Sequence, residues 1–299
     1  MIFIRSISVL LLTALIVCAE TQIRINGSVR KSEAQLLGLM GGRLTHVENK
    51  PASTSRADDA AFLLREVMLK DGYAEVRVAW KILSRDEILL TVQEGMRLSL
   101  GKITISGLPD EDERKFTNLY RSPAEKGRPI TSGSAPFREQ DVEKGLSNIR
   151  QELNAEGYWS AETRIISRQT DAATGAVNIS INAIPGGVHV INTPKIFSPD
   201  GFGMAETRAA VKPFIGQKAT TANLNAMRLA VEETFGSSGY KDAKIQMGRT
   251  LSPPMFIPEF TINLGKRVKL REIYIKGLER TNPQRIAKRM EKLEGDWYD

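Results

Sequence analysis

The side chains most often used in catalysis and metal binding are sparse in this chain of 299 residues. Its two histidines, His46 and His189, have no second histidine, cysteine or carboxylate cluster at the spacing of metal ligands. Ser237 and Ser238 lack the flanking pattern of a nucleophile elbow, and no glycine-rich phosphate loop is present. The sequence therefore predicts no enzymatic activity, no metal site and no cofactor.

The N-terminus has the pattern of a secretory signal, which we place at residues 1–19. Arg5 precedes an apolar run over 7–19, which is 19 − 7 + 1 = 13 residues long, whereas a membrane-spanning helix needs about 20. Cys18 is the only cysteine and lies inside this segment, so the mature chain would have no disulfide. Lipidation of Cys18 is a less favoured alternative, because Val17 is bulkier than the residue a lipoprotein signal prefers there. The pattern predicts export to an envelope compartment such as the periplasm.

The charge of the chain is mildly basic and evenly spread. The formal charge of +7 becomes 7 − 1 = +6 without the signal, and 35 acidic residues are interspersed among the basic ones. This distribution does not form the basic stripe of a nucleic-acid-binding protein, so no nucleic-acid partner is predicted. A local basic excess near the end could favour an anionic membrane surface. It consists of Lys266, Arg267, Lys269 and Arg271.

A glycine-tyrosine pair recurs at the spacing of a small domain. The intervals are 157 − 72 = 85 and 239 − 157 = 82 residues, which indicates a repeated unit. Glycine after a helix adopts a left-handed conformation without Cβ strain, and the next residue can fold back on the last turn. We interpret the pairs as structural helix stops rather than as ligand-binding or catalytic groups. They are Gly72 and Tyr73, Gly157 and Tyr158, and Gly239 and Tyr240.

The hydrophobic pattern around these pairs predicts an α+β fold of tandem β-α-α-β-β repeats. Each repeat is expected to form a three-stranded sheet with two helices on one face, since short alternating strands flank segments of helical periodicity. We place the repeats at 20–98, 99–186 and 187–267. An incomplete fourth repeat, 268–299, would hold a strand at 273–277 and one helix over about 282–293.

The sequence makes three local predictions about helix and strand limits. Ser55 and Asp58 have the spacing of a capping box, which predicts that the second helix of the first repeat begins there. A loop is expected through Pro123. Strand pairing in the last hairpin is expected only after Pro258, because proline lacks an amide hydrogen. The first strand of the third repeat has Thr193 where the other repeats have glycine.

The strand that follows each glycine-tyrosine pair can lie at a sheet edge, with amides and carbonyls free to accept an extended peptide. The alternative is that neighbouring repeats cover these edges, or that Arg77, Lys81 and Arg164 protect them. The predicted protein-binding edge residues are Val76, Arg77, Val78 and Trp80, then Ala161, Thr163 and Ile165, then Ala243, Ile245 and Met247.

Taken together, the repeats resemble POTRA domains, the polypeptide-transport-associated modules of the BamA/TamA superfamily of outer-membrane insertases and translocation pores. The resemblance covers nearly all of the mature chain, about Gln22 to Asp299. The matching motifs are Ile103-x-Ile105-x-Gly107, the three Gly-Tyr-x-x-Ala/Val segments, Glu94-Gly-x-Arg97, and the run from Ile273 through Gly277 and Arg280 to Thr281, continued by Gly295 to Asp299.

The resemblance implies periplasmic repeats that receive unfolded outer-membrane proteins and, in the complete protein, lead into a C-terminal β-barrel in the outer membrane of a Gram-negative bacterium. No barrel strands are present in this sequence. We therefore expect a binding or chaperone array that engages unfolded β-barrel clients or partner lipoproteins by strand addition. A pore component of two-partner secretion and a structural envelope scaffold without client binding are the alternatives.

Overall fold

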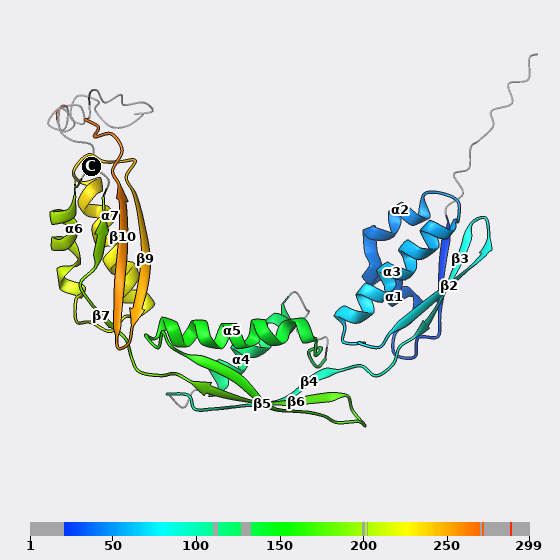
Figure 1. Cartoon of the computed structure of the whole chain (residues 1–299). Coiled ribbons are helices and arrows are strands. Elements are labelled where there is room, and N and C mark those ends of the chain that lie inside the picture. Colours follow the sequence, from blue (N-terminus) through cyan, green and yellow to red (C-terminus); the bar gives the residue numbers. More distant parts are fainter. Residues whose placement is uncertain are drawn as a thin grey trace, which may run out of the picture. The chain divides into compact units, whose positions relative to one another are not determined.

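The computed structural model describes residues 21–109, 113–126, 133–198, 201, 203–269, 271 and 288. Three small sheets, each with its own helices, follow one another along the chain (Figure 1), as the α+β prediction required. The contacts define two compact units whose boundary runs through the middle repeat. The first contains Met1–Lys102, Pro123–Val142 and Arg168–Asn178, and the second contains Ile103–Ser122, Glu143–Ser167 and Ile179–Asp299.

The first repeat has a mixed sheet in the order β1-β3-β2, with β1 parallel and β2 antiparallel to β3. Leu64 and Met68 of its long helix and Ile88 and Leu90 of its central strand are fully buried in one core. The elements are β1 (Gln22–Asn26), α1 (Glu33–Met40), η1 (Gly41–Leu44), α2 (Thr45–Glu48), α3 (Thr54–Lys70), β2 (Arg77–Ser84) and β3 (Glu87–Gln93).

The sequence predicts that the second helix of the first repeat begins with a cap at Ser55, and this position is wrong by two residues. Ser53 is the N-cap of α3, and its hydroxyl accepts a hydrogen bond from the amide of Arg56 at 3.4 Å. Asp58 instead accepts a 2.6 Å hydrogen bond from the indole nitrogen of Trp80 on β2. The carboxylate that looked like part of a cap therefore joins the helix to the edge strand.

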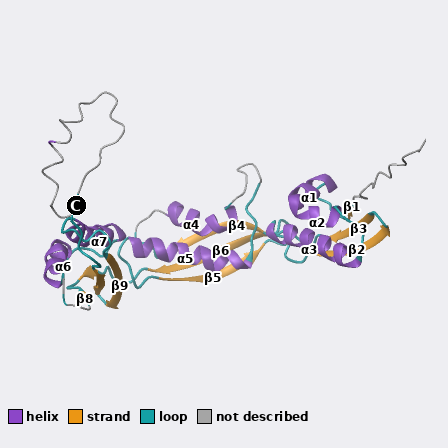
Figure 2. Cartoon of the chain, turned by 90° about the horizontal axis from the view of Figure 1, so that it is seen from above, coloured by secondary structure: helices purple, strands orange, loops and turns teal. Residues whose placement is uncertain are grey.

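The second repeat has the sheet order β4-β6-β5. Both helices lie on the same side of this sheet in Figure 1, and Figure 2 views the repeat from that side. Its elements are β4 (Ser99–Ser106), α4 (Glu113–Glu125), α5 (Glu139–Ala155), β5 (Glu162–Thr170) and β6 (Ala176–Ile184).

Pro123 lies inside α4, so the prediction that it belongs to a loop is wrong. Proline at this position leaves the carbonyl of Leu119, four residues earlier, without its helical donor. Two side chains replace that donor: the hydroxyl of Ser122 donates to Leu119 O at 2.9 Å, and the amide of Asn148 on α5 donates to it at 3.1 Å. The carbonyl is satisfied, and the helix continues through the proline.

The third repeat has a first strand split into two short pieces. Both pieces are parallel to the long central strand β10, which β9 flanks in antiparallel orientation. The elements are β7 (Val190–Ile191), β8 (Lys195–Phe197), α6 (Met204–Val211), η2 (Lys212–Phe214), α7 (Thr221–Gly236), β9 (Lys244–Ser252) and β10 (Met255–Asn263).

Strand pairing in this hairpin begins at Met255, before Pro258, so the expectation that it begins only after the proline is wrong. Between the paired residues Ile191 and Lys195, three residues of the first strand face two residues of β10. Pro258 lies at this bulge, where the parallel partner is interrupted and places no demand on its missing amide. The split occurs at Thr193, where the sequence lacks the expected glycine.

Several predictions concern residues outside the described ranges. These are the signal at 1–19, the strand at 273–277, and the helix over about 282–293 apart from Lys288. Within the described residues, the structure contains no helix long and apolar enough to cross a membrane.

Candidate functional site: edge strands and repeat junctions

In the described part of the chain, β2 pairs with β3 alone and is therefore an edge strand of the first sheet. Val78 and Trp80 point inward and pack against the core, and Val76 just before the strand is 3% exposed. Arg77 alternates with them and is exposed. The apolar side chains of this segment are committed to the core, so the strand offers its backbone edge and its outward side chains to a partner.

An open groove of about 730 Å³ lies beside the beginning of β2. It is bounded by the C-terminal half of α3, the residues after the glycine-tyrosine turn, the first residues of β2 and the end of β3. The residues that line it are Arg65, Ala74, Glu75, Val76, Arg77, Val78, Gln93 and Gly95. Three of the four edge residues predicted in this repeat, Val76, Arg77 and Val78, are therefore brought together at one concave surface.

The second predicted edge is β5, which pairs with β6 in the order β4-β6-β5. Ala161 precedes the strand, and Thr163 and Ile165 are half-buried on its inward side. The hydroxyl of Thr163 already has partners within the repeat. It donates to Leu146 O at 3.3 Å and accepts from Arg150 at 3.0 Å.

The third predicted edge is β9, which pairs with β10 alone in the described residues. Ala243 again precedes the strand, while Ile245 and Met247 pack against the core of the repeat. Among the described residues, all three predicted edges thus have half-buried inward side chains and one backbone side without a partner strand.

The glycine-tyrosine pairs share one backbone geometry. The φ angles of Gly72, Gly157 and Gly239 are +99°, +97° and +90°. The amide of each following tyrosine donates to the carbonyl five residues before it: Tyr73 to Met68 O at 3.1 Å, Tyr158 to Leu153 O at 2.9 Å, and Tyr240 to Phe235 O at 3.1 Å. These are the bonds of a helix that ends in a left-handed glycine, and they turn the chain into the edge strand.

The same glycines also hold the linkers to the following segments, a feature that the sequence reasoning missed. The carbonyl of each glycine accepts a backbone hydrogen bond from a residue just beyond the last strand of its repeat. The pairs are Leu98 N to Gly72 O at 2.8 Å, His189 N to Gly157 O at 2.9 Å, and Val268 N to Gly239 O at 2.9 Å. Every junction therefore uses the glycine turn as its attachment point.

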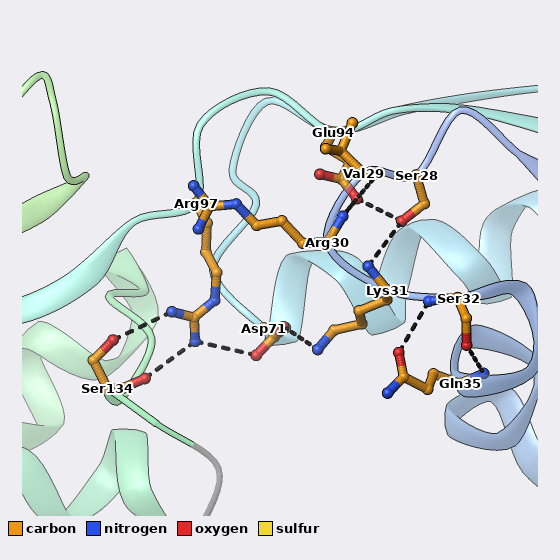
Figure 3. A network of polar contacts seen from close by, with 10 residues as sticks. All are labelled: Ser28, Val29, Arg30, Lys31, Ser32, Gln35, Asp71, Glu94, Arg97 and Ser134. Carbon is orange, nitrogen blue, oxygen red and sulfur yellow. Dashed lines mark hydrogen bonds and ion pairs between the residues drawn. The ribbon is translucent and has the colours of Figure 1, made fainter.

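At the first junction, charged side chains surround this attachment point (Figure 3). Asp71 lies between Lys31, whose ammonium is 3.1 Å from it, and Arg97, whose guanidinium is 3.3 Å from it. Arg97 also donates to Ser134 O at 3.1 Å, which belongs to the second repeat. Nearby, the buried carboxylate of Glu94 accepts from the hydroxyl of Ser28 at 2.6 Å and from neighbouring backbone amides.

Burial raises the pKa of the phenol of Tyr73 above its ordinary value, and the neighbouring carboxylates of Glu94 and Asp71 raise it further, against the smaller opposing influence of Arg30 and Arg97. The tyrosine therefore stays neutral in this acidic surrounding. Its role is that of a buried apolar ring at the junction.

At the second junction an aromatic side chain takes the central position. The ring of Trp159 lies 4.9 Å from that of Phe256, and the guanidinium of Arg249 lies 4.7 Å from the same indole. The indole nitrogen donates to Ala219 O at 2.6 Å. These contacts join the turn after α5 to the third repeat and lie within the second compact unit.

His189 is buried at this junction, and its Nε2 is 3.2 Å from the hydroxyl of Ser160. This pair was not foreseen from the sequence, because 29 residues separate its members. Nδ1 faces the carbonyl of Gly187 at 3.2 Å rather than a carboxylate, which differs from a serine-histidine-aspartate triad. The described residues contain no group of three or more potential metal ligands.

No protein-family model matches this chain, and no curated protein matches it. Among solved structures, POTRA domains 3–5 of Haemophilus influenzae BamA match with a TM-score of 0.40 at 14% identity, covering 82% of this chain and 96% of that one. The N-terminal domain of Omp85 from Thermosynechococcus elongatus matches at 0.34 and 13% identity, covering 82% and 95%. CdiB from Acinetobacter baumannii matches at 0.28 and 14% identity, covering 57% and 30%.

The matches to the BamA POTRA domains and to the Omp85 N-terminal domain each cover 82% of this chain. Every one of the three TM-scores is below 0.5. The fold described above accordingly rests on the strand order and pairing of each repeat in this chain.

Proposed function

We propose that this protein is a periplasmic binding array in which extended segments of unfolded outer-membrane proteins, or of partner lipoproteins, add as a strand to exposed sheet edges. The observation that carries the proposal is the edge of β2, which within the described residues has a partner strand on one side only and has an open groove beside its first residues. Strand addition draws its affinity from main-chain hydrogen bonds, which suits a protein that receives many different sequences.

The experiment uses two proline substitutions in neighbouring positions, Arg77→Pro and Val78→Pro. Successive amides of a strand point to opposite sides, so one proline removes a donor from the free edge and the other removes one from the ladder with β3. Binding of an uncharged, ten-residue peptide of alternating valine and threonine is measured by fluorescence anisotropy with the full chain.

The proline on the free edge should leave the thermal unfolding of the chain nearly unchanged, because it removes no hydrogen bond of the sheet. We expect this variant to bind the peptide about tenfold more weakly, which corresponds to one or two lost main-chain hydrogen bonds. Arg77→Ala is the matched control, because it removes the side chain and keeps the amide. If both prolines leave binding unchanged, the edge of β2 is not the binding site. A chain that binds no extended peptide at all would support the structural scaffold instead.

A further inference from the structure

The three repeats can be aligned at the glycine of each glycine-tyrosine pair, so that equivalent positions around their edge strands can be compared. Seven residues before the glycine, on the helix, the repeats carry Arg65, Arg150 and Glu232. Five residues after it, where the edge strand begins, they carry Arg77, Glu162 and Lys244. The first repeat therefore has two cations at this pair of positions, whereas each of the other two has one cation and one anion.

In the second and third repeats the helix position is engaged by neighbouring side chains. Arg150 donates to Glu143 at 2.5 Å and to the hydroxyl of Thr163 at 3.0 Å. Glu232 forms an ion pair with Arg228 on the same helix. Neighbouring side chains of opposite charge therefore balance the charges of Arg150 and Glu232, and a charged ligand would gain little by binding there.

The first repeat is different. Arg65 and Arg77 line the same groove, and in the part of the chain that the structure describes neither forms an ion pair with a carboxylate. Glu75 also lines this groove, which leaves a formal charge of 2 − 1 = +1 among its lining residues. Two like charges held at one concave surface repel each other, and an anionic ligand would relieve that repulsion.

We propose that the groove of the first repeat selects extended peptides that carry a carboxylate: on a peptide strand paired with β2, side chains of one face would lie beside Arg77 and side chains of the other face would lie toward α3 and Arg65. This inference rests on the proposed strand addition and adds a substrate class to it. Arginine suits the task, because its planar donors can bind a carboxylate with two hydrogen bonds. The edges of β5 and β9 would lack this preference.

The experiment compares three peptides of alternating valine and threonine on the full chain. The first has one central aspartate and an amidated C-terminus, the second has asparagine in its place, and the third is the asparagine peptide with a free C-terminus. We expect the aspartate peptide to bind about fivefold more tightly than its asparagine counterpart at low salt. Preference for the third peptide would show that the groove takes a chain terminus, whereas preference for the first alone would show that it takes a side chain.

The double variant Arg65→Gln with Arg77→Gln should remove this preference, so that the aspartate peptide and the amidated asparagine peptide bind with equal affinity. Arg43→Gln with Arg85→Gln is the matched control, since both of these arginines are exposed and the net charge changes by the same amount. If the carboxylate preference is absent, or persists in the double variant, the inference is wrong while strand addition stands. If none of the three peptides binds, the proposed function is wrong as well.

Discussion

The first and second junctions share a backbone frame and differ in what surrounds it. In both, a left-handed glycine ends the helix and its carbonyl holds the amide of the linker, Leu98 in one case and His189 in the other. Around Gly72 the neighbouring groups are charged, with Asp71 bound by cations. Around Gly157 they are aromatic, with Trp159 at the centre.

The difference indicates that attachment and cohesion are separate properties of a junction. Backbone geometry fixes where the linker attaches, and it is common to both places. Side chains then determine how strongly the flanking segments hold together: a hydrogen-bonded charge network in one, ring packing with a cation over the indole in the other. Ring packing depends on buried apolar surface, and charge networks depend on the ionic surroundings.

The largest expected effect comes from Gly72→Ala. A Cβ at this position would lie 2.3 Å from the carbonyl oxygen of Leu98, and φ is +99°. The substitution should destabilise the first junction by about 3 kcal/mol, because the linker backbone must move in addition to the strain of a left-handed alanine.

Gly157→Ala is its counterpart at the second junction. The atoms nearest to the added Cβ belong to the side chain of Lys218, at 3.1 Å, and a flexible lysine can move away. We expect a loss of about 1 kcal/mol, from backbone strain alone. Chemical denaturation of both variants measures the difference, and equal losses would show that the close approach of Leu98 to Gly72 has no energetic importance.

Trp159→Ala should have the next largest effect, about 2 kcal/mol, because the half-buried indole loses Phe256, Arg249 and its hydrogen bond to Ala219. Trp159→Phe keeps a ring and should recover part of that loss. Thermal unfolding followed by tryptophan-independent far-UV circular dichroism checks both variants. A neutral Trp159→Ala would mean that the aromatic contact does not hold the second junction together.

The sequence predicts the α+β fold and the β-α-α-β-β order of the repeats, but it does not predict the hydrogen bonds that attach the linkers to the glycine turns. The difference has a physical reason. Glycine-tyrosine pairs depend on local helix termination, so their meaning can be read from a few residues. The linker bond to Gly72 or Gly157 joins positions separated by a whole hairpin, and hairpin length varies between repeats. The intervals are 98 − 72 = 26 and 189 − 157 = 32 residues, which hides the pattern.

The incorrect local predictions have a similar origin. The sequence predicts a loop through Pro123, yet the side chain of Asn148 on α5 donates to the carbonyl that this proline leaves without its helical donor. Pro258 was read as the limit of a strand, yet the bulge opposite removes the need for its amide. In both cases a distant partner overrides the preference of the residue. The difference in charge between Arg65 and Glu232 can be seen in the sequence when the repeats are aligned at the glycines of their glycine-tyrosine pairs.

The smallest expected effect is a change with salt in the coupling energy between two side chains, and we expect this change at the first junction but not at the second. A double-mutant cycle of Arg97→Gln and Asp71→Asn should give a coupling energy of about 1 kcal/mol at 0.05 M sodium chloride, because both side chains are mostly buried and directly bonded. The same cycle for Trp159→Ala and Phe256→Leu should give a similar coupling, through ring contact.

Raising the salt to about 0.5 M separates the two cycles, since the screening length falls from about 14 Å to about 4 Å. The coupling of Arg97 to Asp71 should fall by about half, whereas that of Trp159 to Phe256 should stay constant or rise slightly. Urea unfolding curves at both salt concentrations provide the four free energies of each cycle. A salt-independent coupling at Asp71 would show that hydrogen-bond geometry, rather than charge, holds the first junction, and the contrast between the two junctions would then lie in shape alone.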